Sequence, residues 1–480
     1  MARRPTIDDM PRRQVRFVAT DKAVEEGFDA IRAEMEIPPS FPAVVMDEAE
    51  HARPGAPDRD LTEIPFVTID PPGSRDLDQA LHLDRRRGGY TVRYAIADVA
   101  AFVPIGSEVD LEAHRRGLTL YAPDRRTPLY PSALSEDKAS LLPDQDRPAM
   151  MWEIDLDGDG EIVEGRVGRA LVRSRAQLTY DKVQEQLDGA SASPPLRLLA
   201  EVGRLRRLLE EERGAITLPV PEQKVVHEDG GWALEYRAPL PVEDWNAQIS
   251  LLTGIVAAEL MVEGGIGVLR TLPPADRYRV DRLRRVAKAL DIAWPRDVEY
   301  PELIRSLDAR LPAHAAFLAE ATTLFSGAGY QVLGDGEPAR PHAALATLYA
   351  HTTAPLRRLV DRYVGETCLA LSAGNELANP VEQALVPLPE IMARADSLAG
   401  RYEAACINLV EAAVLANRVG EVFSGVVVDM HRDRPRGEVQ LRRPAVHARM
   451  DGEDVDLGEE LLVRLVEASV PTRSVRFEQA

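Results

Sequence analysis

The sequence predicts an α+β fold in which a mixed sheet with surrounding helices is followed by a small C-terminal β-barrel. Residues 61 to about 190 alternate short β-prone runs with turns that contain Gly and Pro. Helical periodicity then dominates to about residue 415. From Gly420 the apolar period switches to two, and five short strands in about sixty residues suit a barrel of the OB type. We therefore predict an N-terminal segment with a linker (1–60), a large domain (61–415) and the barrel (416–480).

The N-terminal segment contains one predicted helix. Asp21 to Glu36 has apolar residues at helical spacing, and Pro38 follows as a terminator. The stretch from Glu48 to Asp60 is rich in proline, glycine and charge, which is typical of a linker.

Composition bounds the class of protein. The chain has 480 residues, 45% of them hydrophobic, and a formal net charge of −20. This balance argues against a generic nucleic-acid binder that relies on net positive charge, but it allows a local basic channel. The sequence contains no run of about eighteen apolar residues, so we expect no membrane-spanning helix. It has no apolar stretch near Met1, so we expect no secretory leader. Cys368 and Cys406 predict buried free thiols in a reducing compartment, so we expect a cytoplasmic protein.

Three aspartates surround one turn near the start of the large domain. The β-prone run Phe66 to Ile69 ends on Asp70, and a Pro-Pro-Gly-Ser turn leads to Asp76 and Asp78. Asp76 and Asp78 are two positions apart, so they share one face of a strand. Converging carboxylates repel each other unless a cation lies between them, and such hard oxygen ligands suit Mg²⁺ or Mn²⁺. From the residues alone, a polar hairpin whose acids face water is an equal alternative.

The same stretch resembles the acidic signature of the ribonuclease II (RNB) family, which reads Thr-Ile-Asp, five residues, then Asp-x-Asp-Asp. The match covers Asp70, Asp76 and Asp78, and Gln79 stands in place of the fourth aspartate. The resemblance implies an RNB-type catalytic domain in which these positions hold a divalent metal and Asp78 is catalytic. An amide offers one neutral oxygen, so we expect weakened Mg²⁺ binding, a preference for Mn²⁺, and a lower Mg²⁺ requirement after Gln79→Asp.

Further blocks resemble the same family and imply RNA contacts. Tyr121 stands where the family stacks a tyrosine on an RNA base, and Tyr180 stands where a tyrosine borders the active site. Ile266 occupies the place of a phenylalanine that clamps the final bases, although Ile266 cannot stack as a ring does. Ser250 and Leu251 replace a pair of family glutamates.

A second block, His351 to Asp361, resembles the family's Thr-Ser-Pro-Ile-Arg-(Arg/Lys)-Tyr-x-Asp. We predict that Pro355 starts a helix whose free N–H groups favour phosphate. The resemblance implies that Arg357 grips RNA beside the scissile phosphate, with Arg358 next to it. Ala354 departs from the family at this block.

Three other residues have competing interpretations. The resemblance implies that Glu403, on a predicted helix, reaches the active site beside Arg357. Asp98 either supports the metal ligands indirectly or caps the end of a strand. His342 matches a family Pro-His, but a histidine with satisfied hydrogen bonds is the preferred explanation.

The barrel carries a predicted cluster of arginines. This cluster is either an RNA-facing patch or a solvated loop, and the family resemblance adds that such chains end in a similar barrel. Its members are Arg432, Arg434, Arg436, Arg442 and Arg443.

We therefore expect a 3′-to-5′ exoribonuclease that hydrolyses single-stranded RNA to nucleoside 5′-monophosphates with Mg²⁺ or Mn²⁺. Ribonuclease II relatives typically carry two cold-shock barrels before the catalytic domain, and about 60 residues leave no room for them. Two alternatives stay open: an RNA-binding pseudonuclease, favoured by Gln79 and the other departures, and a nuclease specialised in trimming RNA 3′ ends. The sequence indicates no membrane partner and leaves protein partners unknown.

Overall fold

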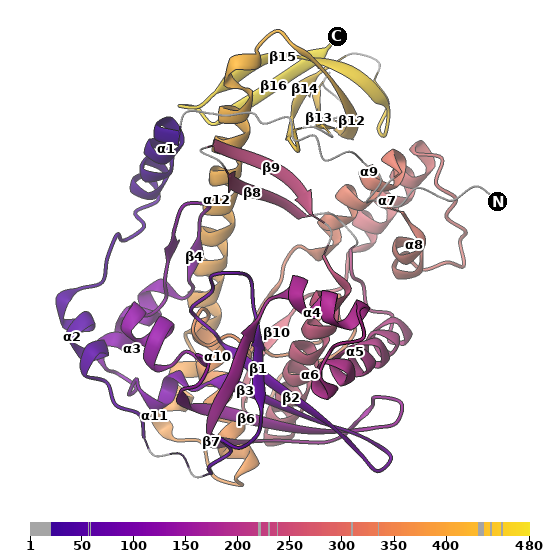
Figure 1. Cartoon of the computed structure of the whole chain (residues 1–480). Helices are drawn as coiled ribbons and strands as arrows, with labels where there is room; N and C mark the ends of the chain where they lie inside the picture. Colours follow the sequence, from indigo (N-terminus) through magenta and orange to yellow (C-terminus); the bar gives the residue numbers. More distant parts are fainter. Residues whose placement is uncertain are drawn as a thin grey trace.

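The computed structural model describes most of the chain between residues 21 and 480. The residues outside this description are 1–20, 56, 58, 219–221, 229–230, 238, 309–310, 335, 431–435, 442–443 and 453–454. A long helix, α12 (Leu388–Leu415), runs from the larger body at the bottom of Figure 1 to a β-barrel at the top.

The predicted mixed sheet closes into a five-stranded barrel. Neighbouring strands pair antiparallel, except that the first and last strands run parallel and close the barrel. Trp152 and Tyr94, opposite each other on neighbouring strands, are fully buried, and the Tyr94 hydroxyl reaches Ser250 of the helix over residues 241–264. The mixed sheet was predicted, whereas its closure depends on pairing between distant segments. The strands, in barrel order, are β1 (Phe66–Ile69), β2 (Gln79–Arg86), β3 (Gly89–Ala97), β6 (Asp146–Asp157) and β7 (Ile162–Leu178).

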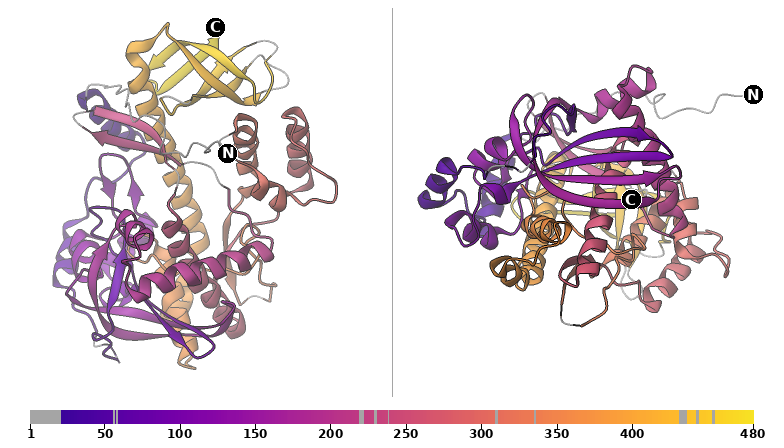
Figure 2. Two further views of the ribbon diagram at one scale, coloured as in Figure 1. Left: turned by 45° about the vertical axis from the view of Figure 1, so that its right-hand side comes forward. Right: turned by 90° about the horizontal axis from the view of Figure 1, so that it is seen from below.

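Helices surround this barrel (Figures 1 and 2). The apolar helix α6 (Pro241–Gly264) packs against α5, α10 and β3. Among the described helices it alone is long and apolar enough to cross a membrane, and side chains such as Leu252 and Met261 are buried in the protein core. The other helices of this body are α2 (Ala43–His51), α3 (Glu108–Arg116), α4 (Tyr180–Asp188), α5 (Pro194–Glu212), α10 (Leu359–Ser372) and α11 (Asn379–Leu385).

The β8–β9 hairpin and a second two-stranded sheet, β10–β11, interrupt the predicted helical region, and a small helical group lies between β10 and β11 in the chain. Alternation in these short strands is masked by flanking helices, so periodicity alone did not predict them. The helical group lies apart from the main body, on the right of Figure 1, and α9 contacts the C-terminal barrel. These elements are β8 (Glu222–Glu228), β9 (Gly231–Arg237), β10 (Gly267–Thr271), α7 (Arg277–Ala289), α8 (Tyr300–Ser306), α9 (Pro312–Ala321), η4 (Thr322–Phe325) and β11 (Gly329–Leu333).

The C-terminal barrel confirms the five predicted strands. Its apolar interior is continuous with α12 and with α1 (Asp21–Glu34), where Phe28 and Ile31 are fully buried. Barrel and helices therefore stabilise one another. The strands, in barrel order, are β12 (Val422–Met430), β13 (Arg436–Leu441), β14 (His447–Asp451), β16 (Ser474–Gln479) and β15 (Glu460–Ser469).

The structure describes only part of the predicted arginine cluster on the C-terminal barrel. Arg442 and Arg443, with Arg432 and Arg434, lie outside the described residues. Arg436 is exposed and pairs with Asp451 (3.4 Å). The linker is shorter than predicted, because α2 extends to His51. The remaining short elements are η2 (Val99–Ala101), β4 (Leu120–Tyr121), β5 (Arg126–Thr127), η3 (Leu134–Lys138) and η5 (Ala416–Arg418).

Candidate active site

The three aspartates lie around the turn between β1 and β2. Asp70 directly follows β1, and its backbone N–H donates to Leu178 at the end of β7 (3.0 Å). Asp78 directly precedes β2 and is 5% exposed. Oδ2 of Asp70 is buried and has no hydrogen-bond partner among the described residues. The strand ends thus hold two carboxylates in largely water-excluded positions.

Asp78 is bound from the opposite side by the segment that precedes α10. The backbone N–H of Leu356 donates to Oδ1 of Asp78 (2.7 Å), and Nε of Arg357 donates to Oδ2 (3.3 Å). Burial raises the pKa of the Asp78 carboxyl to about 7, against the opposing effects of Arg357 and Leu356. Burial likewise raises the pKa of Asp70 to about 6. Both carboxylates lack full charge compensation within the protein, which favours a cation beside them.

The prediction that Pro355 starts a helix is wrong. Helix α10 begins at Leu359, because the backbone at Arg358 is extended and bridges to Leu118. The N–H groups of Ala354 and Leu356 are not free for phosphate, since they donate to Asp361 (2.7 Å) and to Asp78. The segment therefore presents the Arg357 side chain, 44% exposed, rather than a helix terminus.

Asp76 has a partner that the sequence analysis missed. Arg126, on β5, donates to Asp76 and also pairs with Glu136 (2.7 Å). In the β4–β5 hairpin Arg126 lies directly opposite Tyr121. The Pro-Asp turn between these two residues is a hairpin signal that could have predicted this pairing.

Both ends of the Gln79 amide are engaged within the protein. Nε2 donates to the backbone oxygen of Thr353 (2.6 Å), and Oε1 accepts from the Tyr94 hydroxyl (2.5 Å). Ser250 extends this network through the Tyr94 hydroxyl (2.9 Å). Thus Gln79 contacts neutral groups, and Ser250, one of the departures from the family, contacts the same network.

The two predicted tyrosines lie beside the aspartates. Tyr121 is 51% exposed, and its partial burial together with the charge of Asp76 raises the pKa of its hydroxyl to about 12. Tyr180 begins α4, two residues after β7, and accepts a hydrogen bond from Asn246 (3.3 Å). Burial and the charge of Asp70 raise the pKa of Tyr180. Tyr121 therefore offers an exposed ring, whereas Tyr180 is held more firmly.

Three other predicted residues make no hydrogen bond or ion pair to the three aspartates among the described contacts. Ile266 follows the far end of α6, and the helix between Ser250 and Gly264 is about 21 Å long. Glu403 is exposed on α12, and no described hydrogen bond or ion pair joins it to Arg357. Arg358 is paired with Asp361 (2.9 Å) in its own segment.

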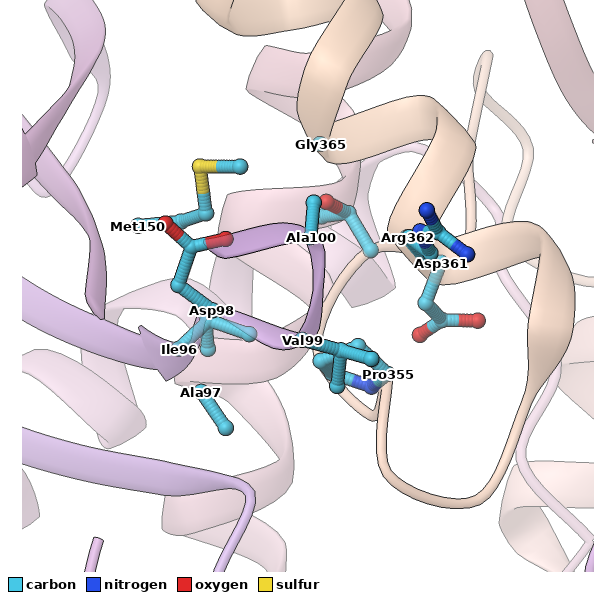
Figure 3. Close-up of a pocket in the computed structure, with 11 residues that line it drawn as sticks. Ile96, Ala97, Asp98, Val99, Ala100, Met150, Pro355, Asp361, Arg362 and Gly365 are labelled. Carbon is cyan, nitrogen blue, oxygen red and sulfur yellow. The ribbon is translucent and has the colours of Figure 1, made fainter. Parts of the chain in front are cut away.

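The structure also distinguishes the two interpretations of Asp98. Its carboxylate accepts from the N–H of Ala101 (3.1 Å), the last residue of η2, and from Nε of Arg169 (2.8 Å). Asp98 therefore caps the end of β3. It lines a cavity of about 10 Å³ between β3 and the start of α10 (Figure 3), where Pro355 and Arg362 lie across from it. This volume holds about one water molecule and is too small for substrate.

The donor set fits a divalent cation held by few protein ligands. Among the described residues, no group of three or more His, Cys, Asp or Glu side chains is arranged to hold a metal ion. Mg²⁺ commonly binds through one or two carboxylates and completes its shell with water and phosphate oxygens. Asp70 and Asp78, with a buried unpartnered oxygen on Asp70, suit this mode. A closed cage of four protein ligands does not suit the residues present, because Asp76 and Gln79 are engaged by Arg126 and Thr353.

Comparison with known families matches most of the chain. The RNB domain matches residues 58–371. The chain belongs to the RNB family. The RNase II-type exonuclease C-terminal S1 domain matches residues 421–480, in agreement with the predicted resemblance and with the second barrel.

Individual relatives support this membership. Ribonuclease R of Aquifex aeolicus is 28% identical over 429 residues, which cover 83% of this chain and 59% of that protein. The chain therefore spans about three fifths of the length of this curated relative. The RNB fold is also seen in Mycoplasma genitalium RNase R in complex with ribose methylated single-stranded RNA, with a TM-score of 0.86 and 19% identity over 95% of this chain and 78% of that chain. Yeast Ssd1, described as a pseudonuclease, has a TM-score of 0.70 and 17% identity over 92% of this chain and 58% of its own.

Proposed function

We propose that this RNB-family protein is a 3′-to-5′ exoribonuclease that hydrolyses single-stranded RNA to nucleoside 5′-monophosphates with a divalent metal. The observation that carries the proposal is the pair of carboxylates, the half-buried Asp70 and the buried Asp78, beside the partly exposed guanidinium of Arg357. Phosphodiester hydrolysis needs negative groups to hold a cation and a positive group to face the phosphate. Relatives named ribonuclease R support the substrate class.

We assign Arg357 the role of stabilising the phosphorane. Its Nε donates to Asp78, and the guanidinium is 44% exposed, which leaves donors for phosphate oxygens. Because the backbone on both sides of Arg357 is fixed by Leu356 and by the bridge between Arg358 and Leu118, the side chain is presented from a rigid segment. Such preorganised positive charge lowers the barrier where negative charge develops.

The metal would be held by Asp70 and Asp78, with hard oxygen chemistry that suits Mg²⁺ or Mn²⁺. When bound, the ion would lower the pKa of a coordinated water and neutralise phosphate charge. Asp78 remains oriented by Leu356 throughout, since a backbone N–H cannot swing away.

Recognition would depend on stacking and the backbone rather than on base sequence. The exposed ring of Tyr121 lies near Asp76, Asp78 and Arg357, within the electrostatic reach of all three. Such a platform accepts any base, because every base has a stacking face. The two buried free thiols support our further proposal of a cytoplasmic location.

A second candidate is an RNA-binding pseudonuclease of the same fold. It is favoured by the engagement of Gln79 and Asp76 within the protein and by the likeness of the fold to Ssd1. A cleavage assay separates the two. Labelled single-stranded and hairpin RNAs are incubated with Mg²⁺ or Mn²⁺, and products are resolved by length and by chromatography of nucleotides.

Stepwise shortening from the 3′ end with release of 5′-monophosphates supports the exoribonuclease. Tight RNA binding with no product in either metal supports the pseudonuclease. Cleavage confined to a few nucleotides beside a hairpin supports the specialised trimming enzyme.

A further inference from the structure

Gln79 joins two parts of the site that lie far apart in sequence. It begins β2, directly after Asp78, and its Nε2 donates to the backbone oxygen of Thr353 (2.6 Å). On the other side Oε1 accepts from Tyr94 (2.5 Å), which is fully buried on β3. The amide therefore links the first barrel to the segment that carries Arg357.

The chemistry of these partners fixes the orientation and the charge at position 79. A backbone carbonyl oxygen only accepts, so the group facing Thr353 must donate. The Tyr94 hydroxyl donates to the opposite atom, so that atom must accept. A neutral amide meets both demands at once, whereas a carboxylate of the same length would set an oxygen against the Thr353 oxygen. The site is built for an amide, not for a weakened carboxylate.

The 353–357 segment is consequently attached to the start of β2 at two successive residues. Gln79 holds Thr353, and Asp78 holds Leu356 and Arg357. Thr353 and Ala354 are almost fully buried, so the segment has little room to move. Loss of the Gln79 attachment would leave Asp78 as the single link between the two among the described side-chain contacts.

We propose that Gln79 binds no metal and is instead a positioning residue that fixes the 353–357 segment, and with it Arg357, against Asp78. The expected effect of Gln79 on kcat rests on the proposed nuclease function. The expected effects of Gln79 on metal binding and on the position of the 353–357 segment do not. The proposal reverses the expectation that Gln79→Asp would improve Mg²⁺ binding.

The experiment compares Gln79→Met and Gln79→Glu with wild type. Methionine keeps the length but removes both hydrogen bonds, and glutamate keeps the shape but adds a charge. Gln331→Met is the matched control. Gln331 is buried, whereas Gln79 is half-buried, and it makes the same kind of two-ended contact: it donates to the Pro338 oxygen (3.0 Å) and accepts from the Arg340 N–H (2.8 Å). It lies on β11 and makes no described hydrogen bond to Asp78 or Thr353.

Three quantities are measured: the Mn²⁺ affinity without RNA, amide hydrogen exchange of peptides covering 353–358, and kcat and KM on a labelled single strand. For Gln79→Met we expect Mn²⁺ affinity within about twofold of wild type, exchange faster by about tenfold, and kcat lower by about tenfold at nearly unchanged KM. Gln79→Glu should also lower kcat. Gln331→Met should leave all three unchanged, so the split between kcat and KM separates positioning from general destabilisation.

A loss of Mn²⁺ affinity of about tenfold or more in Gln79→Met would overturn the proposal, as would activity above wild type for Gln79→Glu at limiting Mg²⁺. If Gln79→Met fails to fold, Tyr94→Phe removes the hydrogen-bond partner at the other end of the amide. This variant should change amide exchange and kcat in the same directions as Gln79→Met, but by smaller factors. Wild-type protein that cleaves no RNA would contradict the proposed function, and the Mn²⁺ and exchange measurements would still decide the role of Gln79.

Discussion

The backbone N–H of Leu356 donates to Oδ1 of Asp78 at 2.7 Å, although 278 positions separate the two residues in the chain. This bond joins the two sequence blocks that carry the chemistry. It also orients a buried carboxylate whose pKa is raised to about 7 by burial. The bond therefore holds the Asp78 carboxylate beside the segment that carries Arg357.

Asp78→Asn should abolish cleavage while RNA binding persists. The asparagine oxygen can still accept from Leu356, so the fold is kept, but the negative charge that we propose to hold the metal ion is lost. We expect a fall in single-turnover rate of about 1000-fold or more, with RNA affinity within about threefold. Asp84→Asn is the control, because Asp84 lies on the same strand but pairs with Arg93 at the surface. Unchanged turnover in Asp78→Asn would remove Asp78 from the catalytic assignment.

Substitution of Arg357 should mainly affect catalysis, whereas substitution of Arg358 should mainly affect stability. Arg357→Ala should lower kcat by about 100- to 1000-fold with little change in stability, because the side chain is partly exposed and faces the site. Arg358→Ala should lower the free energy of unfolding by about 3 kcal/mol, because it leaves the buried carboxylate of Asp361 without its cation. Urea denaturation and single-turnover kinetics measure both effects. Equal stability losses in the two variants would contradict this division.

Tyr121 should contribute to RNA affinity through its ring. Tyr121→Ala should weaken single-stranded RNA binding by about 5- to 150-fold, the range for loss of one base stack, and Tyr121→Phe should bind as wild type. Fluorescence anisotropy on a catalytically silent Asp78→Asn background measures the affinity without cleavage. Tyr278→Ala serves as the control, since Tyr278 is 73% exposed on α7 and away from the aspartates. Equal binding by the alanine and phenylalanine variants would show that Tyr121 does not stack.

His342 should make the protein less stable in acid. Burial, with the nearby charge of Arg270, lowers the pKa of His342 to about 4, while the unfolded chain takes up a proton near 6.5. Below pH 6.5 the unfolded state binds more protons than the folded state, so the free energy of unfolding falls as the pH drops from 6.5 to 4. Partial exposure limits this contribution to about 1–2 kcal/mol.

The comparison of wild type with His342→Asn over this pH range isolates the effect. Other buried groups, including His351, Asp70 and Asp78, titrate in both proteins and largely cancel in the difference. The asparagine variant should lose less stability on acidification than wild type. Parallel stability curves would show that His342 is protonated as readily in the folded protein as in the unfolded chain.

Local signals in the sequence predicted much of the secondary structure and pointed to three candidate aspartates, whereas the other candidate residues came from the family resemblance. The run Phe66 to Ile69, the Pro-Pro-Gly-Ser turn and the alternation after Gly420 are short-range patterns, and each formed the expected strand, turn or barrel. The acidic residues were identifiable because Asp70, Asp76 and Asp78 flank a single turn. Such features depend on neighbours within a few positions, which one sequence displays directly.

The tertiary structure decided how these residues are used. The extended pairing of Arg358 with Leu118 moved the start of α10, and Arg126 on β5 pairs with Asp76 in the turn between β1 and β2. Gln79 could be predicted as a departure from a motif, but its partners Thr353 and Tyr94 come from separate segments. Sequence by itself determined which groups are present and where strands and helices form, since these follow from local propensity and periodicity. Which donor meets which acceptor was decided only when the barrel closed, because buried polar groups must find partners among whatever segments the packing brings together.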